Sequence, residues 1–198
     1  MLDIAIIVGS SRPGGKADAV ADWVRRVASS RSDARFEVVD IREFDIDGPP
    51  VLGAVQYHQG RTHEWAAKIA RFDGFIFVTP EYAHGTSSAL RNAIELLHAE
   101  WMHKAAGFVG YGSANGKRAV EQLRLVMGSV QVADVRAQVM LSLYADFENF
   151  TSFKPSIVHE KNLGTMLDQL VAWSAALQPV RAPRPTEVVE ELALAMGA

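Results

Sequence analysis

The chain has 198 residues, 48% of them hydrophobic and none of them cysteine, which suits one domain with an ample core and excludes disulfides, thiolate nucleophiles and cysteine-ligated metals. A net charge of −3, from 20 basic and 23 acidic residues, argues against nucleic-acid binding. No apolar run approaches the roughly 20 residues that span a membrane, and the N-terminal run ends at a glycine turn, so we expect a cytoplasmic protein without a membrane partner.

The first half of the chain alternates between strand and helix patterns. The apolar run of residues 4–8 predicts a strand buried on both faces. Apolar residues recur at helical spacing over residues 17–28, which predicts an amphipathic helix packed on a sheet. Residues 36–39 predict a second strand, and residues 43–61 predict a long loop that contains turn-forming residues.

The alternation continues through the middle of the chain. We expect a helix over residues 62–71 and a buried third strand over residues 75–79 that ends at Pro80. The next helix is predicted to run as far as Trp101, with Ser87 or Ser88 as its N-cap.

The last part of the chain predicts two more strands and two more helices. Residues 108–111 belong to a fourth strand, and residues 119–127 mark the following helix. A fifth strand with polar breaks is expected within residues 130–139, and the last main helix carries the apolar face of residues 163–174. We therefore predict one domain over residues 1–178, followed by a proline-containing linker and short tail over residues 179–198.

Five strand–helix repeats predict a parallel sheet with right-handed crossovers and helices on both faces. In open sheets of this kind, ligands bind beyond the carboxyl ends of the strands at the point where the strand order reverses. The loops after the first, third and fourth strands are therefore the candidates for a binding site.

The loop after the first strand, Gly9 to Lys16, has the composition of a phosphate site. The hydroxyls of Ser10 and Ser11 can donate hydrogen bonds, Arg12 can fork onto phosphate oxygens, and the positive end of the next helix lies there. An ordinary glycine-rich turn between a strand and a helix is the alternative interpretation. The loop lacks both the Walker lysine, because Gly15 stands at that position, and the dinucleotide-binding glycine pattern.

The loops after the third and fourth strands suit a flat heterocycle. Pro80 and Tyr82 can offer backbone hydrogen bonds in the plane of a ring and an apolar surface near its face, although Tyr82 could equally anchor the loop. The third loop, residues 110–116, is rich in glycine and leaves room for a close approach of its backbone.

Taken together, the three loops resemble those of the NADPH-dependent FMN reductases, a flavodoxin-like family that also includes quinone, chromate and azo-dye reductases. The family's Gly-Ser-x-Arg motif appears as Gly9-Ser10-Ser11-Arg12. Its Pro-Glu-Tyr-Asn motif appears as Pro80-Glu81-Tyr82-Ala83, followed by Leu90-Arg91-Asn92-Ala93-Ile94 where the family has Leu-Lys-Asn-Ala-Ile. Its third motif is a glycine-rich turn after the fourth strand, here within residues 110–116, and the resemblance as a whole covers residues 4–177.

This resemblance implies a three-layer sandwich whose five-stranded parallel sheet has the order 2-1-3-4-5, with tightly bound FMN and NADPH or NADH as electron donor. The FMN phosphate would be surrounded by Ser10, Ser11, Arg12, Lys16 and Ala17. The isoalloxazine ring would be contacted, largely through backbone atoms, by Pro80, Glu81, Tyr82 and Ala83. Its pyrimidine side would be closed by Gly112 and Ser113. The family also implies a homodimer or tetramer.

The sequence departs from the family pattern at three places. Gly15 stands where many members have a serine or arginine, and Ser87-Ser88 replaces the usual Pro-Gly. Ala83 replaces the usual asparagine, which predicts a roomier and less polar site that favours quinones over compact oxyanions such as chromate. Phe147, Phe150 and Phe153 could shield the flavin edge or pin the loop after the fifth strand.

The function implied by the resemblance is ping-pong hydride transfer from NAD(P)H through FMN to a small acceptor, such as a quinone, flavin, azo compound or metal oxyanion. Because this transfer needs no protein acid or base, we name no catalytic side chain. A flavodoxin-type electron carrier and a non-enzymatic interaction protein that has lost its flavin are the alternatives. The histidine spacings do not suggest a metal site.

Overall fold

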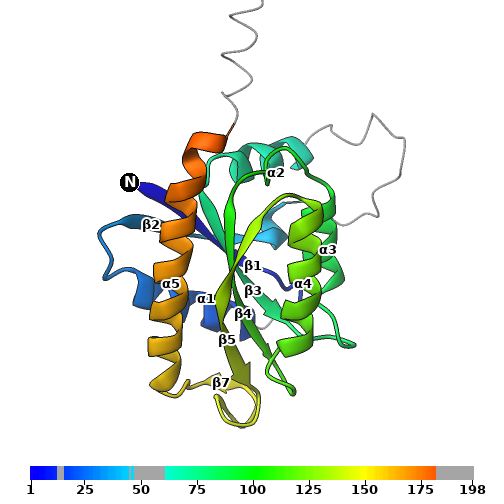
Figure 1. Ribbon diagram of the computed structural model, residues 1–198. Helices are drawn as coiled ribbons and strands as arrows, with labels where there is room; N and C mark the ends of the chain where they lie inside the picture. Colours follow the sequence, from blue (N-terminus) through cyan, green and yellow to red (C-terminus); the bar gives the residue numbers. More distant parts are fainter. Residues whose placement is uncertain (13–15, 45, 47–60, 182–198) are drawn as a thin grey trace, which may run out of the picture.

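The computed structural model describes residues 1–12, 16–44, 46 and 61–181 (Figure 1). Five parallel strands form one sheet in the order β2-β1-β3-β4-β5. They are β1 (Leu2–Val8), β2 (Ala34–Asp40), β3 (Gly74–Pro80), β4 (Ala105–Gly112) and β5 (Ala133–Ser142). The predicted flavodoxin-like order is therefore confirmed.

Helices cover both faces of this sheet (Figure 1). One face packs against α1 (Lys16–Ala28) and α5 (Val158–Leu177), and the other packs against α2 (Arg61–Ala70), α3 (Ser88–Glu95) and α4 (Lys117–Ser129). The strands are apolar on both faces because side chains alternate along them: Ile4 and Ile6 point to the first helix layer, whereas Ala5 and Ile7 point to the second.

Four short elements complete the described chain. The 3₁₀ turn η1 (Ile41–Glu43) follows β2, and η3 (Gln178–Val180) follows α5. Beyond β5, the chain forms a small antiparallel pair from β6 (Phe147–Glu148) and β7 (Ser152–Phe153). This pair lies at the end of the molecule where the strands of the main sheet end (Figure 1).

The predicted helix that runs to Trp101 is shorter in the structure. Helix α3 ends at Glu95, although Leu97 and Trp101 are both buried. The indole Nε1 of Trp101 donates a hydrogen bond to the Ile94 carbonyl at 3.0 Å. The apolar spacing therefore indicated that the turns after α3 are buried, and not that they are helical. The indole N–H binds the Ile94 carbonyl, which the backbone of a further helical turn would otherwise have bound.

The fifth strand runs beyond its predicted end and contains an irregularity. The register pairs Ala106 with Asp134 and then Phe108 with Gln138, so Gly107 alone lies opposite residues 135–137. This bulge accounts for the polar breaks in the sequence pattern, because its backbone turns out of the regular ladder.

Several predictions concern residues outside the described ranges. These are most of the long loop, at residue 45 and residues 47–60, and the tail beyond residue 181. The domain boundary at residue 178 and the linker that follows it stay predictions. Among the helices that are described, none is long and apolar enough to cross a membrane.

Candidate cofactor site at the strand ends

The three candidate loops meet at one edge of the sheet. Val8 of β1 pairs with Val78 of β3, and Pro80 of β3 pairs with Tyr111 of β4. The chain leaving β1 stays attached to β3, because the Gly9 N–H donates to the Val78 carbonyl at 2.9 Å. The chain leaving β3 likewise stays attached to β4 through a 2.9 Å hydrogen bond from the Glu81 N–H to the Tyr111 carbonyl.

The first loop combines a buried hydroxyl with exposed groups at the start of α1. Ser10 is buried, and its Oγ accepts a 3.4 Å hydrogen bond from the Arg12 N–H. Ser11 and Arg12 are exposed, and Lys16 begins the helix. The side chain of Ala17 is buried in the core below α1, so Ala17 can offer an anion only its backbone N–H. Gly15 lies outside the described residues.

Ser87 ties the first loop to the helix after β3. Its Oγ donates to the Gly9 carbonyl at 2.6 Å and accepts from the Leu90 N–H at 3.1 Å, which makes it the N-cap of α3. Gly9 has no room for a side chain, since an added Cβ would lie 2.6 Å from Leu90 Cδ2 and 2.8 Å from the Val78 carbonyl oxygen. The serine at position 87 therefore serves a structural purpose that a proline could not.

The second loop forms a tight two-residue turn. Tyr82 and Gly85 exchange two backbone hydrogen bonds of 2.8 and 2.9 Å. The two residues between them, Ala83 and His84, are exposed and have φ angles of 47° and 66°. This is the left-handed conformation of a type I′ turn, which holds the tip of the loop in one shape.

Aromatic and cationic side chains connect the first two loops. The guanidinium carbon of Arg12 lies 4.0 Å from the centroid of the Tyr82 ring, within the range of a cation–π contact. Tyr111 is buried on β4, and burial together with the neighbouring Tyr82 raises its phenol pKa, while the nearby Ser10 side chain opposes that shift. The Tyr111 hydroxyl is therefore neutral at physiological pH and available for hydrogen bonding.

The third loop approaches the second one closely. A Cβ at Gly112 would lie 3.0 Å from the Cβ of Glu81, and Gly116, with a φ of 71°, would place a Cβ against the backbone nitrogen of Tyr111. Ser113 is exposed beside Gly112. The Glu81 carboxylate points away from solvent and binds Arg118 at the start of α4, so Glu81 faces the site with its backbone.

Sequence reasoning missed the buried carboxylate that shapes the chain after β5. Asp146 Oδ2 accepts from the Ser142 N–H at 2.8 Å, and its Oδ1 accepts from the Ser156 N–H at 3.2 Å. Oδ1 also lies 3.1 Å from His159 Nε2. An aspartate that binds residues four, ten and thirteen positions away leaves no periodic signal in the sequence.

Of the three phenylalanines after β5, two pack against other aromatic rings of the fold and one is exposed. The rings of Phe147 and Phe153 lie 5.0 Å apart between centroids, and Phe153 meets Trp23 of α1 at 5.8 Å. Phe150 is 54% exposed and contacts Tyr144. Phe147 and Phe153 therefore pin the loop after β5, as expected, whereas Phe150 is exposed and contacts Tyr144 of the same loop.

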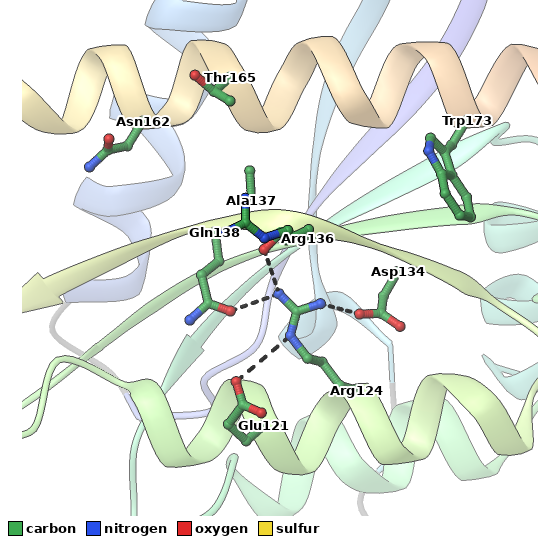
Figure 2. A pocket seen from close by; sticks show the side chains of 9 residues that line it. All are labelled: Glu121, Arg124, Asp134, Arg136, Ala137, Gln138, Asn162, Thr165 and Trp173. Atoms are coloured by element: carbon green, nitrogen blue, oxygen red, sulfur yellow. Dashed lines mark hydrogen bonds and ion pairs between the residues drawn. The ribbon is translucent and has the colours of Figure 1, made fainter.

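A cavity of about 890 Å³ lies away from these loops, between α4, β5 and α5 (Figure 2). Its central side chain, Arg124, is bound by Glu121, Asp134 and Gln138 and by backbone carbonyls of β5. Because these polar groups satisfy one another, we place the candidate site at the strand ends and not in this groove. In the described part of the chain, no three histidine or carboxylate side chains are grouped to hold a metal ion.

The strand-end site fits a phosphorylated planar cofactor. A buried hydroxyl, an arginine and a helix N-terminus meet at the first loop, which suits a phosphate. Gly112 and Gly116 leave no room for side chains at the third loop, because an added Cβ would meet Glu81 Cβ or the backbone of Gly110 and Tyr111.

Comparisons with known proteins show the family of this chain. The family model described as NADPH-dependent FMN reductase matches residues 2–146. An NAD(P)H-dependent FMN reductase of Schizosaccharomyces pombe is 32% identical over 168 residues, which cover 82% of this chain and 84% of that protein. A 2-hydroxy-1,4-benzoquinone reductase of a Burkholderia species is 27% identical over 188 residues, covering 87% and 96% of the two chains.

Solved structures show the same fold. The flavoenzyme NAD(P)H:(acceptor) oxidoreductase FerB of Paracoccus denitrificans superposes with a TM-score of 0.69 at 18% identity, covering 89% of this chain and 98% of that one. A flavodoxin of Streptococcus pneumonia superposes with a TM-score of 0.56 at 15% identity, covering 86% and 98%. With the match of the family model over most of the sequence, the chain belongs to the NADPH-dependent FMN reductase family.

Proposed function

We propose that this oxidoreductase transfers two electrons from NAD(P)H, by way of FMN held at the strand ends, to a small acceptor in a ping-pong cycle. The observation that carries the proposal is the meeting of the Ser10–Arg12 loop, the Tyr82 turn and the Gly112 loop at one edge of the sheet. When bound, FMN supplies the hydride-accepting ring, and the chain supplies its binding and orientation.

The residues of the site have separate tasks in this proposal. Ser10, Ser11, Arg12 and the backbone at the start of α1, Lys16 and Ala17, bind the phosphate. The backbone of residues 80–83 and of residues 112–113 lines the ring. The proposed cycle is ping-pong because both substrates are assigned to one face of the ring, so that the oxidised nicotinamide must leave before the acceptor can reach it.

A quinone is the acceptor that we favour. Ala83 gives the tip of the second loop only a methyl group, and it is exposed beside the half-buried Tyr82. Such a surface suits a flat apolar molecule better than a compact oxyanion. The similarity to a protein named as a benzoquinone reductase supports the same choice.

The assembly and location of the protein are also part of the proposal. We propose a homodimer or tetramer in the cytoplasm, supported by the family membership and by the absence of cysteine from the sequence. Sedimentation of the flavin-loaded protein measures the first of these directly, and a monomer at micromolar concentration would contradict it.

The proposed function is tested by flavin titration followed by turnover. The purified protein should bind FMN with a stoichiometry near one per chain, and the complex should oxidise NAD(P)H when a naphthoquinone is added. Binding without NAD(P)H oxidation would indicate an electron carrier. A chain that binds no FMN at micromolar concentration would contradict both roles.

Arg12 gives a sharper test of the phosphate site. Replacing Arg12 with alanine should weaken FMN binding roughly tenfold to a hundredfold, because a charge-assisted bidentate contact is worth about 1.5–3 kcal/mol. Riboflavin lacks the phosphate and should lose only a few-fold, through the lost contact with Tyr82. Arg25→Ala on the outer face of α1 is the matched control. Equal losses for both flavins would show that Arg12 supports the loops and does not bind phosphate.

A further inference from the structure

The side chain of Glu81 is buried although it belongs to an exposed loop. Its side chain is only 4% exposed, whereas the side chain of its partner Arg118 is 45% exposed. Glu81 Oε1 accepts from Arg118 Nε at 2.6 Å, and Oε2 accepts from the backbone N–H of Arg118 at 3.1 Å. The carboxylate therefore holds both the guanidinium group and the main chain of the same residue.

Helix α4 lacks a cap of its own. Its N-cap position is Gly116, which has a left-handed backbone and no side chain to accept a hydrogen bond from the first turn. The free N–H groups of a first helical turn need acceptors, and a carboxylate there also interacts favourably with the helix dipole. Glu81 supplies that acceptor from a loop 37 residues earlier in the chain.

The backbone of Glu81 is fixed at the same place. Its N–H donates to the Tyr111 carbonyl at 2.9 Å, and its Cβ packs so closely on Gly112 that a side chain at position 112 would collide with it. One residue thus joins the end of β3, the end of β4 and the start of α4.

We propose that Glu81 is a positioning residue that caps α4 and locks the loop after β3 to the loop after β4. The two stretches of backbone that would line the flavin ring, residues 80–83 and 112–113, are thereby held as one rigid unit. The inference rests on the proposed function, because it assumes that these loops bind the ring. It gives the Glu81 side chain a role distinct from the ring contact that the family resemblance implies for this position.

The experiment compares FMN with riboflavin in Glu81→Ala, Glu81→Gln and Arg118→Gln. Glu81→Ala should weaken both flavins by the same factor, roughly threefold to thirtyfold as for the loss of a helix cap, and leave their affinity ratio unchanged. Glu81→Gln should restore most of the affinity, since its amide oxygen can still accept from the Arg118 N–H. Arg118→Gln keeps the backbone hydrogen bond and an amide N–H beside the buried carboxylate, so it should lose less affinity than Glu81→Ala.

The control is the ion pair between Arg91 and Glu95 on the exposed side of α3. Glu95→Gln removes a surface charge pair without touching the loops and should change neither affinity. Titrations well below the melting temperature keep every variant folded, so a merely general loss of stability would leave both dissociation constants unchanged. The visible absorption bands of the bound flavin should shift in Glu81→Ala and return in Glu81→Gln.

Hydrogen exchange separates this proposal from the proposed function. The amide of Arg118 should exchange at least tenfold faster in Glu81→Ala than in the natural protein, whether or not flavin binds. If the natural protein binds no flavin, the proposed function fails, and this exchange rate still tests the cap. The cap is refuted if the exchange rate does not change. Riboflavin affinity equal to the natural value in Glu81→Ala, or a loss in Arg118→Gln as large as in Glu81→Ala, would also overturn the proposal.

Discussion

Ala83 has a backbone angle that alanine rarely adopts. Its φ of 47° lies in the left-handed region, where the Cβ of an L-residue costs roughly 1–2 kcal/mol. The two hydrogen bonds between Tyr82 and Gly85 impose this angle, and asparagine or glycine adopts it more easily. The asparagine that the family usually has at this position therefore suits the turn itself, in addition to any contact with the flavin.

Replacing Ala83 with asparagine should stabilise the protein. We expect a gain of about 0.5–1 kcal/mol in the free energy of unfolding, measured by urea denaturation, because asparagine tolerates the left-handed conformation. Ala114→Asn is the control, since the φ of Ala114 is not positive. A gain of the same size in both variants would contradict the explanation. The ratio of kcat/KM for naphthoquinone and chromate in Ala83→Asn tests the predicted acceptor preference separately.

At the level of single residues, the sequence predicted which loops meet at the candidate site. Several of the interactions that fix the geometry of these loops could be found only in the structure. Ser10, Arg12 and Tyr82 follow strand ends, so a parallel sheet brings them together on topology alone. Ser87 was one of two predicted N-caps, with Ser88, but its hydrogen bond to the Gly9 carbonyl spans 78 positions. The carboxylate of Glu81 similarly binds the start of α4, which lies 37 positions later in the sequence.

At the level of secondary-structure elements, β5 is an edge strand whose bulge is covered by the two flanking helices. Arg124 of α4 donates to the carbonyl of Arg136 at 3.2 Å (Figure 2) and to that of Val135 at 2.8 Å. Gln169 of α5 accepts from the Ala137 N–H at 2.9 Å. Unpaired groups on a sheet edge invite pairing with other chains, and side chains that occupy them prevent it.

Removing Arg124 should weaken and expose this edge. Arg124→Ala should lower the free energy of unfolding by about 2–3 kcal/mol, because several charge-assisted hydrogen bonds are lost at a side chain that is 19% exposed. It should also increase self-association, which light scattering detects. Arg136→Ala, an exposed position on the same strand, should change stability by less than about 0.5 kcal/mol. The edge role of Arg124 is wrong if the two variants behave alike.

The strands and helices could be predicted where apolar periodicity is strong. They were harder to predict where contacts of single side chains determine a bulge, a short strand pair or the end of a helix. All five strands and the helices packed on them follow from buried runs and amphipathic spacing. Arg124 binds carbonyls of the bulge in β5, and the buried Asp146 binds the backbone on both sides of the pair β6–β7. Neither set of contacts has a signal in the sequence pattern of its segment. The end of α3 depends on where the Trp101 indole finds an acceptor.

At the scale of the whole molecule, one buried charge lies at the other end of the sheet, just before β4 begins. Lys104 is 5% exposed, and its Nζ donates to the last carbonyls of α2, from Ile69 at 2.9 Å and Ala70 at 3.2 Å. Burial, with a smaller contribution from the nearby Arg181, lowers the pKa of this amine from 10.5 to about 7. A neutral amine can still donate both hydrogen bonds.

This lowered pKa makes the stability of the whole domain depend on pH. Between pH 7 and pH 10 the unfolded chain holds the Lys104 proton and the folded chain releases it, so the contribution of Lys104 to stability rises with pH. The slope is at most about 1.4 kcal/mol per pH unit, and we expect a rise of about 2 kcal/mol from pH 7 to pH 9.

The measurement is the free energy of unfolding of the natural protein and of Lys104→Met at several pH values. Methionine keeps the length of the side chain without a titrating group, so the difference between the two curves isolates Lys104 from every other group that titrates in this range. The variant should be less stable at all pH values, because the carbonyls of Ile69 and Ala70 lose their donor. Its deficit relative to the natural protein should grow as pH rises from 7 to 9. Parallel curves would mean that Lys104 keeps its proton when folded, held by the carbonyls at the end of α2 and by the ring of Phe75, 5.4 Å away.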